Sequence, residues 1–234
     1  MQKADLCRSH IIPEFLYSTL YDDKHHFIAL EDVESGEIRK GQKGHRERLL
    51  CSGCESLINK FEKHSRRLFV DPLPAFVMGS VRIREHPRLD YNLLKLFFLS
   101  ILWRASVSSL PLFEHVYLGP HEELIRKMLV SGQSGASTHY PIAIFALNYD
   151  GDHFRDLLVQ PTYARVEGRR CYRFVMMGFV VFIFVASMPA PSPFPLIALN
   201  PEKPVRSFSA EFNEFGFLKE VWRRAGESTK DHGD

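Results

Sequence analysis

The chain has few cysteines, no excess charge of one sign and no long hydrophobic run. Its 234 residues include four cysteines, too few for a disulfide scaffold. Thirty Lys and Arg against 28 Asp and Glu leave a formal charge of +2, so any argument for a polyanionic partner has to be local. The longest apolar stretch, residues 174–188, is shorter than the roughly 18 residues of a spanning helix. We expect it to form buried strands.

Targeting and repeat signals are also missing. The residues before Pro13 contain no apolar core of the length that a signal peptide needs, and no internal repeat or low-complexity tract is found. Hydrophobic residues make up 45% of the chain, which is typical of a folded globular protein. These features predict a cytoplasmic protein in a reducing compartment, without a membrane segment.

Composition changes near residue 71, where a polar, His-rich segment gives way to Asp71-Pro72-Leu73-Pro74. Paired prolines are avoided by helices and by central strands, so this is the expected boundary. Residues 1–70 are predicted to form a small zinc-supported module, and residues 75–230 a larger α+β domain. Three of the four cysteines and five of the eleven histidines lie in the first segment.

Hydrophobic periodicity predicts the elements of both segments. In the first, residues 27–30 and 38 flank a turn and favour a hairpin, and residues 51–67 favour a helix. In the second, a nearly all-apolar helix is expected from its cap at Asp90 to residue 104. A short helix that opens with residues 119–123 is expected to end at residue 130. A further helix is expected over 209–224, with Phe212, Phe215, Leu218 and Val221 or Trp222 inward. Strands are expected at residues 141–147, 162–166, 172–177 and 179–186, with a tight turn at 167–169. The predicted fold class is α+β, with helices packed on a mostly antiparallel sheet.

The strongest chemical signal is a pair of metal-ligand spacings. Cys7 and His10 form a C-x2-H pair, and Cys51 and Cys54 form a C-x2-C pair at the start of a predicted helix. Two such pairs can close one tetrahedral zinc site, and a bound metal can fold a segment with a small core. The spacing therefore predicts a treble-clef-like zinc module. In the alternative, Cys7 and His10 are unrelated to the helix pair, and Cys51 and Cys54 are small buried residues.

Two motifs resemble those of the HNH, or His-Me finger, endonucleases. His10-Ile11-Ile12-Pro13 is similar to the family's His-Ile-x-Pro signature, and residues 49–55, Leu-Leu-Cys-Ser-Gly-Cys-Glu, are similar to its Leu-Cys-x-x-Cys-His helix start. The resemblance covers about residues 5–65. It implies that His10 is the general base that activates water, beside a Mg²⁺ or Mn²⁺ ion that stabilises the phosphate and the leaving group.

Three positions depart from the family pattern. Ser9 stands where the family has a metal-binding Asp, Arg46 where it has an Asn, and Glu55 where it has a His. Glu55 could share the divalent ion with His10 or could instead complement the helix dipole. His10 cannot be both a zinc ligand and a free base, so these two roles stay open. His25, His26, His45 and His64 are substitutes for the base.

Basic residues surround the predicted zinc helix and favour a phosphate-rich partner. Cations outnumber acids by four over residues 39–48. The candidate nucleic-acid-binding residues are Arg39, Lys40, Lys43, Arg46, Arg48, Lys60 and Lys63. We therefore expect a metal-dependent endonuclease that acts on DNA or RNA. The alternative is a non-catalytic zinc module that binds nucleic acid or a protein, with the second segment serving to dimerise or to bind a protein partner.

Overall fold

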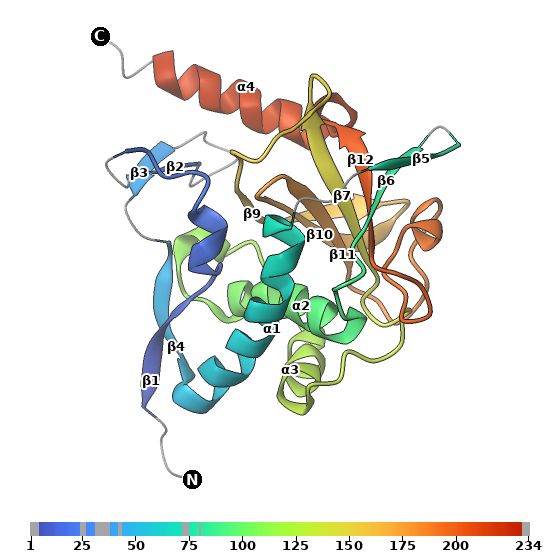
Figure 1. Ribbon diagram of the computed structural model, residues 1–234. Helices are drawn as coiled ribbons and strands as arrows, with labels where there is room; N and C mark the ends of the chain where they lie inside the picture. The colour runs from blue at the N-terminus through green and yellow to red at the C-terminus, as the bar shows by residue number, and fades with distance from the viewer. Residues whose placement is uncertain are drawn as a thin grey trace.

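The computed structural model describes residues 5–23, 27–30, 38–41, 44–71, 75–79 and 81–230 (Figure 1). The helices are α1 (Ser52–Val70), α2 (Tyr91–Val107), α3 (His121–Ser131) and α4 (Gly216–Lys230), with short 3-10 turns η1 (Glu14–Tyr17), η2 (Pro111–Phe113), η3 (Phe194–Leu196) and η4 (Phe212–Glu214). The strands are β1 (Leu6–His10), β2 (Phe27–Leu30), β3 (Ile38–Gly41), β4 (Arg46–Cys51), β5 (Phe76–Met78), β6 (Val81–Glu85), β7 (Ile142–Tyr149), β8 (Asp152–His153), β9 (Val159–Val166), β10 (Arg169–Met176), β11 (Phe179–Phe184) and β12 (Arg206–Glu211).

The first segment folds as a two-stranded ribbon followed by a helix. β1 pairs antiparallel with β4, and the chain then enters α1 directly, with Cys51 as the extended N-cap residue. Helix α1 buries Ile58, Phe61, Ser65 and Leu68, which recur at three- and four-residue spacing along one face. β2 and β3 form the expected hairpin, and the turn between them lies outside the described residues.

The second segment is built on an eight-stranded sheet in the order β5-β6-β12-β7-β11-β10-β9, with β8 paired to β7. Its pairs are antiparallel except for β12 and β7, which run parallel. Glu167 and Gly168 both have positive φ in the turn between β9 and β10, the geometry of a two-residue hairpin turn. The mostly antiparallel α+β class and this turn are confirmed.

Helices cover both faces of the sheet (Figure 1). Helix α2 starts at Asp90, whose side chain accepts a hydrogen bond from the Leu93 backbone N–H over 2.8 Å, and it has apolar residues on almost every side. It lies in the core on one face of the sheet, and α4 with η4 closes the other face. Because α2 is surrounded by protein, it can be apolar all round.

The first segment shares its core with the second. Ile11, Leu16 and Phe61 belong to the same buried cluster as Phe97 and Phe174, and α1 packs along α2. The apolar residues of the first segment are therefore buried against α2 and the sheet. This contact supplies the apolar burial for which the sequence alone suggested a bound metal.

One predicted helix was placed wrongly at its start. Residues 206–211 form β12, and α4 begins only at Gly216. Phe212, Phe215, Leu218 and Val221 are buried as expected, whereas Trp222 is 56% exposed. The apolar spacing continues through the strand end and η4, so periodicity could not mark the boundary. Within the described residues, no helix is both long and apolar enough to cross a membrane.

Candidate active site

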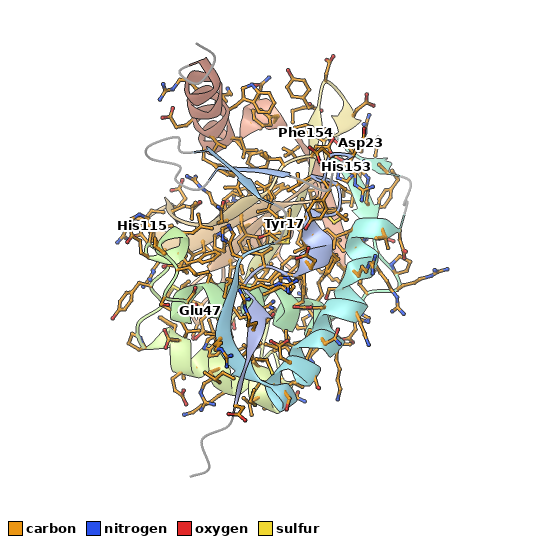
Figure 2. All side chains as sticks on the ribbon, turned by 90° about the vertical axis from the view of Figure 1, so that its left-hand side faces the viewer. Tyr17, Asp23, Glu47, His115, His153 and Phe154 are labelled. Carbon is orange, nitrogen blue, oxygen red and sulfur yellow. The ribbon has the colours of Figure 1, made fainter. Side chains whose placement is uncertain are left out.

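The register of the β1–β4 ribbon places four basic side chains on its outer face. Arg8 lies directly opposite Arg48, and His10 directly opposite Arg46. Side chains two residues apart on a strand point to the same side, so all four share one face. Arg8 and Arg48 are exposed, and His10 and Arg46 are half-buried. Figure 2 views the ribbon from this side.

His10 stands between a cation and a carboxylate. Arg46 Nε donates to His10 Nε2 over 2.6 Å, and Glu14 Oε2 lies 2.7 Å from the same nitrogen. A ring nitrogen can accept one hydrogen or carry one. When His10 is neutral, Nε2 accepts from Arg46. When it is protonated, Nε2 donates to Glu14. The two contacts therefore belong to different charge states of one imidazole.

Burial and charge favour the neutral state. Burial and the nearby Arg46 charge lower the pKa of His10, although Glu14 acts in the opposite direction. For Glu14, burial raises the pKa, but hydrogen bonds and the His10 and Arg46 charges outweigh it, so that the net shift is downward. The lowered pKa of His10 favours a neutral imidazole, whose Nε2 lone pair accepts from Arg46, beside the Glu14 carboxylate. That combination suits a general base.

A turn after β1 positions Glu14. Pro13 fixes the backbone before η1, which begins at Glu14. Tyr21 OH donates to Glu14 Oε1 over 2.5 Å, and a side chain on Gly44 would reach within 2.6 Å of the Tyr17 ring. Only glycine fits at this approach of the chain to the site. We call His10, Glu14, Tyr21 and Arg46 the His10 cluster. Figure 2 shows Tyr17 near the centre of the view.

A buried ion pair holds the backbone of His10 in place. Arg104, on α2, donates to the His10 carbonyl over 2.8 Å and pairs with Glu62 of α1 over 2.9 Å. The Arg104 side chain is only 3% exposed. Because burial of a charge is costly unless it is paired and hydrogen-bonded, this contact ties β1, α1 and α2 together at one point.

The inner face of the ribbon is structural. Ser9 Oγ accepts from the Leu50 backbone N–H over 3.1 Å, which makes it a link between the two strands. Glu47, directly opposite Ser9, accepts hydrogen bonds from Ser108 and Ser109 at the end of α2. Ser9 therefore does not face the His10 cluster.

The predicted zinc ligands are only partly brought together. Cys51 and Cys54 lie at the start of α1, and their side chains are hydrogen-bonded to each other. Cys7 is opposite Leu50, on the other face of the ribbon from His10, which lies at the far end of β1. Among the described residues, no group of three or more His, Cys, Asp or Glu side chains could hold a metal ion. Zinc binding stays a prediction.

Glu55, the second predicted catalytic residue, lies in the first turn of α1. Its charge acts on Arg104 and Glu62, and its Oε1 atom is buried without a hydrogen-bond partner among the described residues. The structure does not place it in a common metal-binding group with His10. A role beside the buried Arg104 fits this position better than a role at the reacting centre.

The predicted nucleic-acid-binding residues are spread over the ribbon and α1. Arg46 and Arg48 are on the outer face of the ribbon, and Lys60 and Lys63 are exposed on α1. Arg39 and Lys40 fall in β3, of which only the backbone is described. Lys43 lies outside the described residues. Of the candidates whose side chains are described, Arg48, Lys60 and Lys63 are exposed, and Arg46 contacts His10.

Sequence reasoning missed Glu14, Tyr21 and Arg104. Glu14 follows His10 by four residues across Pro13, a spacing that could have been noticed. An arginine within the apolar run of α2 is itself a signal of a buried ion pair. Comparisons with models of protein families, with curated proteins and with solved structures found no match.

Proposed function

We propose that the chain is a nuclease of the HNH type that hydrolyses phosphodiester bonds in DNA or RNA, with His10 as the general base. The observation that carries the proposal is the position of His10: a neutral imidazole at the end of β1, on a basic ribbon face, followed by β4 and α1. The strand-strand-helix order matches the two sequence motifs that suggested the family.

The ribbon suits a nucleic-acid backbone. Arg8, Arg46 and Arg48 lie on the same face as His10, and arginine forks bind phosphate oxygens in two-pronged fashion. Arg8 and Arg48 form no ion pair within the described part of the chain. Two like charges directly opposite each other destabilise a ribbon, and a bound phosphate would relieve that repulsion.

The hydrolytic step uses His10, Glu14 and Arg46 of the His10 cluster. An incoming phosphate is a stronger acceptor for Arg46 than the imidazole is, and its arrival would release the Nε2 lone pair. Nε2 then takes a proton from water as the water oxygen attacks phosphorus. The bond from phosphorus to the leaving oxygen breaks, that oxygen takes a proton from solvent water, and His10 then returns its proton to solvent. Glu14 balances the positive charge that His10 gains.

The HNH resemblance also implies a divalent ion beside His10, and we tested whether the residues fit one. Such an ion needs several oxygen ligands. Glu14 is the carboxylate in contact with His10, its Oε1 accepts from Tyr21, and its Oε2 is 3.9 Å from the Arg46 guanidinium. The cationic position is thus taken by Arg46. The residues do not fit a divalent ion in this arrangement, and the step above does not depend on one.

The test compares wild type, His10→Ala and the surface control His115→Ala on labelled single-stranded and duplex DNA and RNA. Each reaction is run with EDTA, Mg²⁺ or Mn²⁺. We expect His10→Ala to lower the cleavage rate by at least about 100-fold, the usual contribution of a general base, and His115→Ala to cut normally. Cleavage that survives in His10→Ala would refute the catalytic role.

A second candidate function is nucleic-acid binding without catalysis. It is favoured because His10 Nε2 has a partner in either charge state, Arg46 when the imidazole is neutral and Glu14 when it is protonated. In that case wild type would retain the strands without cutting them under every metal condition. Arg8→Gln/Arg48→Gln would then weaken binding, and His10→Ala would not.

A further inference from the structure

A second pair of directly opposed arginines lies far along the chain, at the edge of the large sheet. Arg165 of β9 faces Arg170 of β10, and Tyr163 faces Tyr172 in the same register. Side chains two residues apart on a strand point to the same face of the sheet. The four residues 163, 165, 170 and 172 therefore share one face. Like charges directly opposite are unfavourable in a sheet, which calls for an explanation.

Aromatic rings hold the two arginines in place. Each guanidinium carbon lies 5.9 Å from the centroid of the Tyr163 ring, and Arg170 is also 5.6 Å from that of Tyr172. Arg170 Nη2 donates to Tyr172 OH over 3.0 Å. Contacts between cations and ring faces are attractive. They offset part of the repulsion. Arg165 is exposed, and Arg170 is half-buried.

A nearby loop adds an exposed aromatic ring. The Tyr117 backbone N–H donates to Tyr172 OH over 2.9 Å, and Tyr172 OH donates to the Tyr117 carbonyl over 2.8 Å. These two bonds fix the loop while Tyr117 remains 71% exposed, and Tyr163 is 43% exposed. We call Tyr117, Tyr163, Arg165 and Arg170 the Tyr-Arg surface.

The charge of this surface is not balanced by acids. Neither Arg165 nor Arg170 forms an ion pair with any described residue, because their bonds go to the Gly168 carbonyl and to Tyr172 OH. Glu114, on the neighbouring loop, contacts His115. Burial, and next the Arg170 charge, lowers the pKa of His121 at the start of α3. The surface therefore presents an unneutralised positive charge.

We propose that the Tyr-Arg surface binds single-stranded nucleic acid. Arginine forks suit backbone phosphates, and exposed aromatic rings stack with unpaired bases whatever their sequence. A duplex keeps its bases stacked internally and cannot offer them to Tyr117. Phosphate charge explains the opposed arginines, and base stacking explains the exposed tyrosines, so a single strand accounts for both features together.

One loop joins this surface to the ribbon. Ser109 contacts Glu47 of β4, the Phe113 ring lies 6.2 Å from that of His45, and Tyr117 is bonded to β10. Figure 2 shows His115 of this loop and Glu47 in the left half of the view. The inference rests on the proposed function for its link to cleavage, because a strand held here would extend toward His10.

Binding is tested separately from cleavage, with the full chain and fluorescence anisotropy. The probe is a labelled strand of about 20 nucleotides, longer than one binding site, as DNA, as RNA and as a matched duplex. A gel after each titration checks that the strand is intact. The variants are Arg165→Gln/Arg170→Gln and Tyr117→Ala. Tyr117→Ala keeps both backbone bonds to Tyr172. Lys203→Gln/Lys219→Gln removes the same charge from exposed positions outside the Tyr-Arg surface and serves as the control.

We expect the arginine variant to weaken single-strand binding at least about tenfold and to reduce the salt slope by about 1.4, the value for two lost phosphate contacts. Tyr117→Ala should weaken it by about tenfold as well, and the lysine control should bind normally. Both DNA and RNA strands should respond. Equal affinity for the duplex with no effect of Tyr117→Ala would overturn the proposal, as would an arginine variant that binds like the control. If the variants of the Tyr-Arg surface lose strand binding while His10→Ala changes cleavage as before, the binding proposal is separated from the catalytic one.

Discussion

His10 and Arg46 face each other across the end of the β1–β4 ribbon, and the Arg46 Nε hydrogen points at the nitrogen that we assign as the catalytic base. The contact couples the protonation of His10 to the position of Arg46. A base held in this way is neutral at rest and becomes available when Arg46 turns to another acceptor.

This coupling predicts opposite pKa changes in two variants. Arg46→Ala removes a positive charge that lowers the pKa of His10, so that pKa should rise, whereas Glu14→Gln removes the charge that raises it, so that pKa should fall. NMR titration of the His10 ring measures both changes. Arg48→Ala is the control, because Arg48 lies opposite Arg8. Shifts of the same sign in the first two variants would contradict the arrangement.

The buried pair behind His10 predicts a large effect on stability. Arg104→Met leaves Glu62 without its cation, and loss of one partner of a buried ion pair costs about 3–5 kcal/mol. Urea unfolding should show this as a lower midpoint with an unchanged slope. Arg104→Met/Glu62→Leu should recover part of the loss, since no charge then remains unpaired.

An exposed pair on α3 provides the comparison. Arg126 and Glu123 are 47% and 53% exposed, and exposed pairs contribute little. Arg126→Met should leave the unfolding midpoint almost unchanged. If Arg104→Met behaves in the same way, the tie between β1, α1 and α2 is not important for stability.

Local patterns predicted much of the fold, and long-range pairings were beyond them. Asp90, the apolar run of α2 and the turn at Glu167 are local signals, and each appeared where expected. Arg104 donates a hydrogen bond to the His10 carbonyl, 94 residues away in the sequence, and no residue spacing predicts this contact. The motif around His10 pointed to the site, but the pairing of β1 with β4 determined that Arg46 lies beside it and that Cys7 faces away.

The buried lysine on α2 predicts a specific pH dependence. Lys95 is 1% exposed and donates to Tyr91 OH and the Ala136 carbonyl, and burial lowers its pKa from 10.5 to about 7. Between these values the unfolded chain binds more protons than the folded one, so stability should increase as pH rises from about 7 toward 10.5. Each pH unit can add up to about 1.4 kcal/mol.

Lys95→Met should remove this dependence. The variant should be more stable than wild type near pH 7, and the difference should shrink as the pH approaches 10. Chemical unfolding at several pH values measures it. Lys127→Met, at a position 66% exposed, should follow the wild-type curve. A Lys95→Met curve that also parallels wild type would mean that Lys95 titrates normally in the folded protein.

The thiols at the start of α1 should differ in reactivity from each other and from the buried Cys171. Hydrogen bonding from the Cys54 backbone, and then from its side chain, lowers the pKa of Cys51, whereas burial raises the pKa of Cys54 and raises that of Cys171 to about 11. Because the thiolate is the reactive form, iodoacetamide at about pH 8 should label Cys51 first and Cys171 last, as read by mass spectrometry. If Cys51 and Cys54 bind zinc as the C-x2-C spacing predicts, added zinc should slow labelling of both, and a chelator should restore it. Labelling that zinc leaves unchanged would remove the pair from the candidate metal ligands, and Cys171 reacting as fast as Cys51 would contradict the order of reactivity.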